Sequence, residues 1–267
     1  MTITRLSPLL LIATLATPVQ AETINCTPIT SLPATISTQG VYCLTGNLAT
    51  NITDGYAIEI TANNVTLDLN GWKIGGQGAG TGTHSIGIYS GAVNVTVKNG
   101  IVRGFYFGID LEGRGAVVQD MLVDQNTSVG IFVGDLGALV EHNQVVDTGG
   151  STYSANEPAL GIVAIDTSTV SNNVVSGVTA TGGNDETGIY IGQPNSTVRD
   201  NVVSDTAKPT GGGASYGIFQ SQSIAVNNTV SNFAIGINNN GGIYAHNTAY
   251  NCTTAYSGGT AGTGNSP

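Results

Sequence analysis

Short apolar runs recur along the chain and are separated by Gly, Asn, Asp and Ser. Seven Gly-Ile pairs open successive units, 19 to 31 residues apart, and their glycines are Gly87, Gly108, Gly130, Gly161, Gly188, Gly217 and Gly236. An Asn or Asp follows each pair 11 to 13 residues later, and another short apolar run comes directly after it. Val- and Ile-rich runs bounded by turn-forming residues predict β-strands. No helical period of useful length lies between them.

Each unit holds three such runs within about 21 to 25 residues, which leaves no room for crossover helices. A chain that must bury one apolar face per unit can instead coil, so that each turn covers the one before it. The sequence therefore predicts an all-β, single-stranded parallel β-helix of about eight coils, spaced by about 4.8 Å. Crossovers between parallel strands are right-handed in nearly all proteins, so we expect a right-handed coil.

The recurring polar residue predicts a structural ladder, because equivalent residues of stacked coils lie above one another. An Asn side chain both donates and accepts, so a column of them can form hydrogen bonds along the stack. The predicted ladder comprises Asn70, Asn99, Asp120, Asn143, Asn173, Asn201, Asn228 and Asn247. The coils that end at Asn143, Asn173 and Asn201 carry one extra residue before the Asn, which leaves the register open by one there.

With its Gly-Ile units and polar column, the chain resembles the right-handed parallel β-helix proteins of the pectate-lyase-like group. The resemblance covers roughly residues 55–256 and concerns the architecture, because no motif of a particular family accompanies it. A shared fold does not by itself imply a shared function.

The segments outside the repeats have their own signatures. Residues 1–21 have the charge, apolar core and small-residue end of a secretory signal peptide, with cleavage expected after Ala21. We therefore expect a secreted or periplasmic protein without a membrane-inserted segment. Residues 22–54 are interpreted as an N-terminal cap on residues 55–256, because an open β-helix end exposes strand edges and core. The polar tail, residues 257–267, is predicted to be disordered.

The chain has three cysteines. In an oxidising compartment, Cys26 and Cys43 are expected to form a disulfide that ties the cap. Cys252 is left over; it is interpreted as a buried small apolar residue in the last coil, with a thiol that joins two chains as the alternative.

The net charge of the chain limits the classes of partner that it can bind. The chain has a formal net charge of −10 at pH 7, and only 9% of its residues are charged. Such an acidic chain without a basic patch is not expected to bind nucleic acid or an anionic membrane. The oligomeric state leaves no signature in the sequence.

Four long connections, residues 75–85, 148–160, 177–187 and 204–215, precede Gly-Ile pairs and are expected on one side of the stack. Strand alternation then turns the residue after each Ile outward. Four of these residues are aromatic, and they form a predicted stripe for stacking on sugar rings: Tyr89, Phe132, Tyr190 and Phe219. Tyr153 and Glu157, on a long connection beside the stripe, complete the predicted binding residues. The alternative is that the rings stabilise the sheet by packing across strands.

Carboxylates on successive coils are the candidate catalytic groups: Asp110, Glu112, Asp135 and Asp166. A coil spacing of about 4.8 Å can bring pairs of them into the separation that glycosidases use, about 5 to 9.5 Å. Like charges at that distance separate the two pKa values and so create an acid and a base. The same oxygens could hold Ca²⁺, although no cofactor is required. The alternative is that these acids are solvated turn residues.

Comparison with known enzymes of this architecture argues against a pectinolytic one. Pectate lyases combine Ca²⁺-binding acids with an arginine base, whereas Arg103, Arg114 and Arg199 are scattered here, and no adjacent Asp pair or Arg-Ile-Lys motif of the polygalacturonase type occurs. An anionic pectic substrate would also be repelled unless Ca²⁺ bridged it to the protein. Three hypotheses remain: a protein that binds and perhaps modifies an extracellular polysaccharide, a structural or adhesive β-helix without a ligand, and a polysaccharide lyase or glycoside hydrolase.

Overall fold

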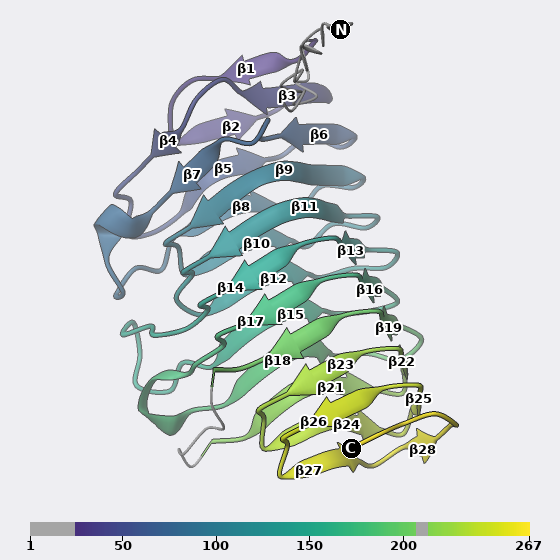
Figure 1. Cartoon of the computed structure of the whole chain (residues 1–267). Coiled ribbons are helices and arrows are strands. Elements are labelled where there is room, and N and C mark those ends of the chain that lie inside the picture. The colour runs from purple at the N-terminus through teal and green to yellow at the C-terminus, as the bar shows by residue number, and fades with distance from the viewer. Residues whose placement is uncertain (1–24, 207–212) are drawn as a thin grey trace, which may run out of the picture.

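The computed structural model describes residues 25–206 and 213–267, and these residues form a stack of parallel β-coils (Figure 1). The predicted signal peptide and its cleavage site lie outside the described residues. Two hydrogen-bonded sheets run the length of the stack, and every strand pair in them is parallel. The fold is thus the predicted all-β parallel β-helix.

The first sheet has ten strands, one for each coil. In chain order they are β2 (Ala34–Ile36), β5 (Tyr56–Ile60), β8 (Ile86–Ser90), β10 (Phe107–Leu111), β12 (Val129–Val133), β15 (Ala159–Ala164), β18 (Glu186–Ile191), β21 (Ser215–Ser221), β24 (Ile235–Asn240) and β27 (Thr254–Ser257). The sequence predicted about eight coils; nine of these strands begin within residues 55–256, and β2 precedes that range.

The second sheet has eighteen strands, and most coils contribute two short ones to it. They are β1 (Thr27–Ile29), β3 (Gly40–Leu44), β4 (Leu48–Ala49), β6 (Val65–Asp68), β7 (Lys73–Gly75), β9 (Val95–Arg103), β11 (Val117–Asp124), β13 (Leu139–Glu141), β14 (Gln144–Val146), β16 (Thr169–Ser171), β17 (Val174–Ser176), β19 (Thr197–Arg199), β20 (Val202–Ser204), β22 (Ile224–Val226), β23 (Thr229–Ser231), β25 (Ile243–Ala245), β26 (Thr248–Tyr250) and β28 (Thr260–Ala261).

The Gly-Ile pairs lie in the ten-stranded sheet, and their isoleucines stack in register from coil to coil: Ile88 pairs with Ile109, and Ile109 with Ile131. These isoleucines are fully buried and face valines of the other sheet. The glycine of each pair is required because a larger residue would not fit. A Cβ on Gly130 would lie 2.6 Å from Val145 Cγ1 and 2.6 Å from the Gly161 carbonyl oxygen. The repeat therefore needs Gly because the valine of the same coil fills the space beside it.

The corner within the eighteen-stranded sheet explains the recurring polar residue and corrects the predicted ladder. The ladder begins at Asn143, whose backbone N–H and Nδ2 donate to Asn173 Oδ1 at 2.9 and 3.0 Å. The same pair of bonds links each later member to the next, through Asn173, Asn201, Asn228, Asn247 and Asn265. Each Nδ2 from Asn143 to Asn247 also donates to a carbonyl of the preceding coil. One amide thus connects three coils.

Asn70, Asn99 and Asp120 are not members of this ladder. They have φ of 49°, 56° and 54° and lie one residue earlier, in the column that makes the left-handed corner. Their equivalents in later coils are the residues just before the ladder asparagines, such as His142 and Asn172, both at φ 56°. Asn and Asp tolerate this conformation better than most residues. Met121 occupies the ladder position after Asp120, and its N–H donates to Asn143 Oδ1 at 3.0 Å.

Both ends of the described chain belong to the coil stack, unlike the predicted boundaries. Strands β2, β3 and β4 pair with β5, β6 and β7, so no separate cap precedes residue 55 in the described part. The disulfide between Cys26 and Cys43 joins β3 to the segment before β1. In the tail, β28 pairs with β25 and Asn265 extends the ladder, because its amide fits the same column. The prediction of a disordered tail was wrong.

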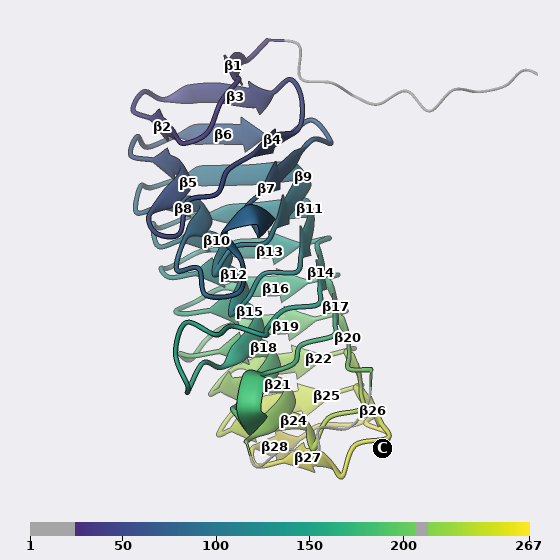
Figure 2. The same ribbon diagram turned by 90° about the vertical axis from the view of Figure 1, so that its left-hand side faces the viewer.

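Three of the long connections, residues 75–85, 148–160 and 177–187, project from one side of the stack (Figures 1 and 2). They contact one another: Thr152 N–H donates to the Thr81 carbonyl at 3.0 Å, and Asn184 Nδ2 to the Ala155 carbonyl at 3.0 Å. Two of them contain single turns of 3₁₀-helix, η1 (Gln77–Ala79) and η2 (Thr181–Gly183). In the described residues, no helix has the length and apolar character needed to cross a bilayer.

Candidate functional site

The outer face of the ten-stranded sheet carries two columns of side chains in register. One column contains the predicted stripe and reads Glu59, Tyr89, Asp110, Phe132, Val163, Tyr190, Phe219 and Asn238. The parallel column reads Tyr56, Ile86, Phe107, Val129, Leu160, Thr187, Tyr216 and Ile235. Most of these side chains are half-buried, so the outer face is apolar and only partly open to solvent.

Two rings of the stripe stack on each other, and a third stacks on a ring of the parallel column. Tyr190 and Phe219 have ring centroids 5.1 Å apart at an interplanar angle of 5°, and Tyr89 stacks on Tyr56 at 4.3 Å and 10°. Rings paired face to face along the helix axis present their edges outward. For Tyr190 and Phe219, stabilisation of the sheet by cross-strand packing therefore accounts for the geometry.

A different set of rings offers an open aromatic surface, which we call the aromatic track: His84, Tyr106, Phe107, Phe132 and Tyr153. Tyr153 lies at its outer end, with 52% of the residue exposed, and one face of its ring stacks on His84 at 4.4 Å. The track then continues through Tyr106 and Phe107, whose ring centroids are 5.0 Å apart, to Phe132. The Phe132 ring centroid is 6.3 Å from that of Phe107. It connects a long loop with the face of the ten-stranded sheet.

Glu157 holds the loop end of the aromatic track. Its Oε2 accepts a 2.6 Å hydrogen bond from the Tyr106 hydroxyl, and the residue is only 9% exposed. Burial, together with this bond to Glu157, raises the pKa of Tyr106 to about 12, so the phenol stays protonated and donates. Glu157 and Tyr153, both predicted from the sequence, thus meet at Tyr106.

Asp110 lies on the sheet between Tyr89 and Phe132 and is 5% exposed, although its side chain belongs to an outward column. Its Oδ1 is buried without a hydrogen-bond partner. Burial raises the pKa of Asp110 to about 7, and the nearby charge of Glu112 raises it further in the same direction.

The other candidate acids have different surroundings. Glu112 is exposed and accepts a 3.1 Å bond from the Tyr89 hydroxyl; burial, together with this bond, raises the pKa of Tyr89 to about 12. Asp135 and Asp166 occupy turns after the next two strands, and Asp135 Oδ1 accepts the N–H of Leu136 at 2.6 Å. The structure therefore brings Asp110 and Glu112 together, whereas Asp135 and Asp166 have the positions of turn residues.

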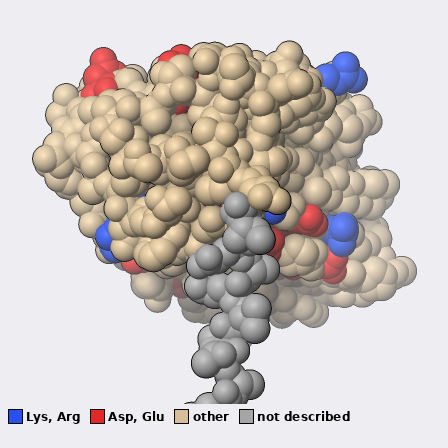
Figure 3. All heavy atoms as spheres, turned by 90° about the horizontal axis from the view of Figure 1, so that it is seen from above, with Lys and Arg blue, Asp and Glu red and all other residues tan. Residues whose placement is uncertain are grey.

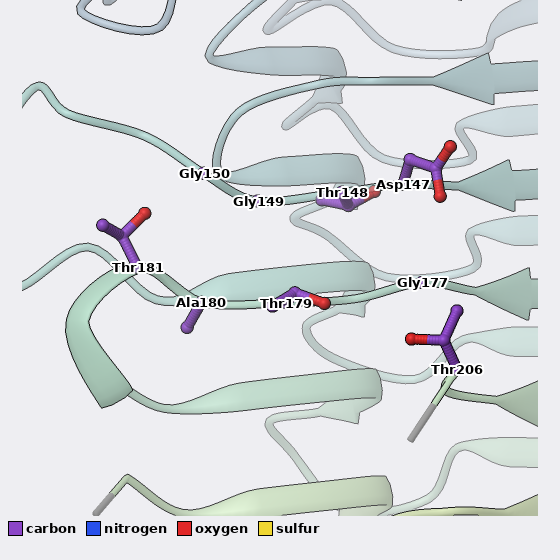
Figure 4. Close-up of a pocket in the computed structure, with 9 residues that line it drawn as sticks. All are labelled: Asp147, Thr148, Gly149, Gly150, Gly177, Thr179, Ala180, Thr181 and Thr206. Atoms are coloured by element: carbon purple, nitrogen blue, oxygen red, sulfur yellow. The ribbon is translucent and has the colours of Figure 1, made fainter. Parts of the chain in front are cut away.

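A second pair of buried acids lies near the long connections. Glu186 is 5% exposed and Asp205 is 7% exposed, and burial raises the pKa of both carboxyls. A cavity of about 420 Å³ lies beside them, lined by Asp147, Thr179 and Thr206 among others (Figure 4). None of the predicted site residues lines this cavity, which is shaped mainly by loop backbone, glycines and threonines.

Charged side chains are sparse on the surface seen along the helix axis (Figure 3). In the ranges 25–206 and 213–267, no group of three His, Cys, Asp or Glu residues is placed to hold a metal ion.

Sequence reasoning missed His84, Tyr106 and Phe107. The ring of His84 supports Tyr153, and its Nδ1 lies 3.6 Å from Asp54 Oδ1. The Phe-Tyr-Phe run at residues 105–107 is the one signal that could have identified two of them. Its placement depends on the coil register, which brings the loop of Tyr153 back over an earlier coil.

No family model matches the chain, and no curated protein matches its sequence. Solved structures do match. The Dettilon tailspike protein aligns with 84% of this chain and 54% of its own at 17% identity and a TM-score of 0.59. The enzymatically active domain of bacteriophage CBA120 tailspike protein 2 aligns with 81% of this chain and 38% of its own, at 14% identity and a TM-score of 0.53.

The A-module of Azotobacter vinelandii mannuronan C-5 epimerase AlgE6 covers 91% of both chains at 14% identity, with a TM-score of 0.37 that is too low to support an argument. This chain spans about half or less of the tailspike chains, and at these identities the likeness concerns the fold. The stacked parallel coils and these neighbours together show that the chain is a right-handed parallel β-helix protein.

Proposed function

We propose that the protein binds an extracellular polysaccharide along the aromatic track, across the outer face of the ten-stranded sheet. The observation that carries this proposal is the Tyr153 ring, which is half exposed while His84 supports its inner face. Sugar rings have apolar C–H faces that pack on such a surface, and an aromatic group held rigid in advance loses little entropy on binding. Glu112 is an exposed acceptor for sugar hydroxyls nearby on the same face.

The test compares two exposed tyrosines. Tyr153→Ala should weaken binding about three- to tenfold, the effect of losing one aromatic contact of about 0.5 to 1.5 kcal/mol. Tyr250→Ala is the matched control, because Tyr250 is 67% exposed but lies on the eighteen-stranded sheet. Retardation in gels that contain single polysaccharides identifies a binder, and titration calorimetry then gives its affinity. Equal losses in both variants, or no retardation by any polysaccharide, would count against the proposal.

A second candidate function is hydrolysis or elimination on the bound polysaccharide by Asp110 and Glu112. The observation that favours it is a pair of neighbouring carboxyls of which one is buried with a pKa raised to about 7 and the other is exposed. Such a pair can supply a general acid and a base. Release of reducing or unsaturated ends that is abolished by Asp110→Asn, and not by Asp135→Asn or Asp166→Asn, would assign the chemistry to this pair. If neither binding nor turnover is found on a broad panel, a structural or adhesive role remains.

We also propose export from the cytoplasm. The Cys26–Cys43 disulfide supports this, because such bonds persist in oxidising compartments. Protein recovered outside the cytoplasm should begin at Glu22, which N-terminal sequencing checks; a chain that still begins at Met1 would contradict it.

A further inference from the structure

The outer face of the ten-stranded sheet has charge of only one sign. Its outward positions carry Glu59 and Asp110, Glu112 follows directly after β10, and none of the described strands of this sheet contains a Lys or Arg. The described basic residues lie elsewhere: Lys73, Lys98, Arg103 and Arg199 on strands of the eighteen-stranded sheet, and Arg114 in a turn. Lys98, Arg103 and Arg199 are also paired, with Asp68, Asp124 and Asp200. The charged groups of this face are therefore not neutralised by basic residues within it.

One short segment concentrates these charges among rings. Residues 106–112 contribute Tyr106 and Phe107 to the aromatic track and then Asp110 and Glu112. Glu157 joins the same segment through its 2.6 Å bond from the Tyr106 hydroxyl. Three carboxyl groups thus border one continuous aromatic surface.

Asp110 gives a second, separate indication that a ligand binds at this face. Only 5% of the residue is exposed, although it belongs to an outward column. Its Oδ1 accepts no hydrogen bond. A buried carboxylate oxygen without a donor is costly, so the site favours a positive charge that arrives from outside. Aromatic faces add to this preference because their quadrupoles attract cations.

We propose that the aromatic track, with Asp110, Glu112 and Glu157, binds sugar units that carry a positively charged amino group. This inference rests on the proposed function and narrows its ligand from polysaccharides in general to amino-sugar polymers. Anionic polymers meet uncompensated carboxylates on this face, and neutral polymers lack the charge that these groups attract.

The pH dependence follows from the groups that face Asp110. They are Glu112 at the end of its own strand and Tyr89 on β8, whereas Phe132 on β12 adds no charge. Because the pKa of Asp110 is about 7, its charge is present above that pH and lost below it. Affinity for a permanently charged ligand should therefore rise as the pH increases through about 7.

The experiment uses oligosaccharides that differ in charge. Trimethylated chitosan oligomers are permanently cationic, chitin oligomers of the same length are neutral, and oligogalacturonate is anionic. Calorimetric titration of the full-length mature protein at pH 8 and low ionic strength should give the highest affinity for the cationic oligomer, with a clear loss in high salt. Glu112→Gln and Asp110→Asn should each weaken cationic binding about fivefold at pH 8, and the effect of Asp110→Asn should disappear at pH 5.

Glu141→Gln is the matched control, because it removes a carboxyl from β13 on the other sheet and should leave the affinity unchanged. Melting curves of all variants verify the fold. Stronger binding of the neutral or anionic oligomer, or cationic binding that is insensitive to Glu112→Gln and salt, would overturn this inference while polysaccharide binding stands. If none of these oligomers binds, and no polysaccharide retards the protein in gels, the proposed function fails as well.

Discussion

The substitution Asp110→Asn gives a direct measure of how the fold tolerates an acid on its aromatic face. In the native protein the pKa of Asp110 is about 7, against an ordinary value of 3.8, because burial disfavours its charged form. Each unit of pKa shift corresponds to about 1.4 kcal/mol, so ionised Asp110 costs the folded state about 4 kcal/mol.

The direction of the pKa shift determines the pH range in which this cost to stability appears. Well below the ordinary value of 3.8 the carboxyl is protonated in both the folded and the unfolded chain, and the ionisation costs nothing. As the pH rises from 4 to 7, the unfolded chain loses this proton first, and the folded protein loses stability relative to it. Above pH 7 the cost is constant. Asn cannot ionise, so the variant should gain stability over the native protein as the pH rises, by up to about 4 kcal/mol.

The assay is urea unfolding followed by circular dichroism at a series of pH values from 4 to 8, for the native protein and Asp110→Asn. The difference in unfolding free energy matters rather than either value, because a constant packing effect of the amide then cancels. Glu141→Gln shows the effect of removing one acid from the other sheet. A difference that stays flat between pH 4 and 8, or a carboxyl resonance of Asp110 that titrates near 4 by NMR, would refute the reasoning.

Three further predictions concern the coil stack. Gly130→Ala should destabilise the protein by about 2 kcal/mol, because the new Cβ meets Val145 Cγ1; adding Val145→Ala should restore part of the loss, and urea unfolding measures both. Asn173→Ala should cost about 3 kcal/mol in the same assay, because several buried hydrogen bonds lose a partner; a loss below about 0.5 kcal/mol would exclude a structural role for the ladder. Reducing the Cys26–Cys43 disulfide should cost about 3 kcal/mol, seen as a lower melting temperature in reductant, and an unchanged melting temperature would contradict it.

The architecture could be predicted because it depends on local spacing. The Gly-Ile pairs mark one strand of each coil, and the stack follows from burying their isoleucines. The ladder was predicted one residue out of place in its first coils, because Asn99 and Asp120 suit a left-handed corner as well as an amide column. The dipeptides His142-Asn143 and Asn172-Asn173 separate the two roles, since a corner residue is followed directly by a ladder residue.

The site was harder to predict. Alternation correctly placed Tyr89 and Phe132 on the outer face, but it could not show that Asp110, which lies between them, is buried. The position of Tyr153 depends on how a long loop folds back over an earlier coil, and no periodicity encodes that. A binding surface made by loops therefore lies beyond what repeat spacing can predict.

The column of asparagines has a consequence for how such a chain can change length. Each member donates from its N–H and its Nδ2 to the next coil, and its Oδ1 accepts from the preceding coil. An interior coil is therefore interchangeable with its neighbours at this corner. Duplicating or removing the stretch from one member to the next leaves every remaining contact of the column satisfied. The molecule can thus evolve, or be engineered, in whole-coil steps, with the loops of each added coil free to acquire a new surface.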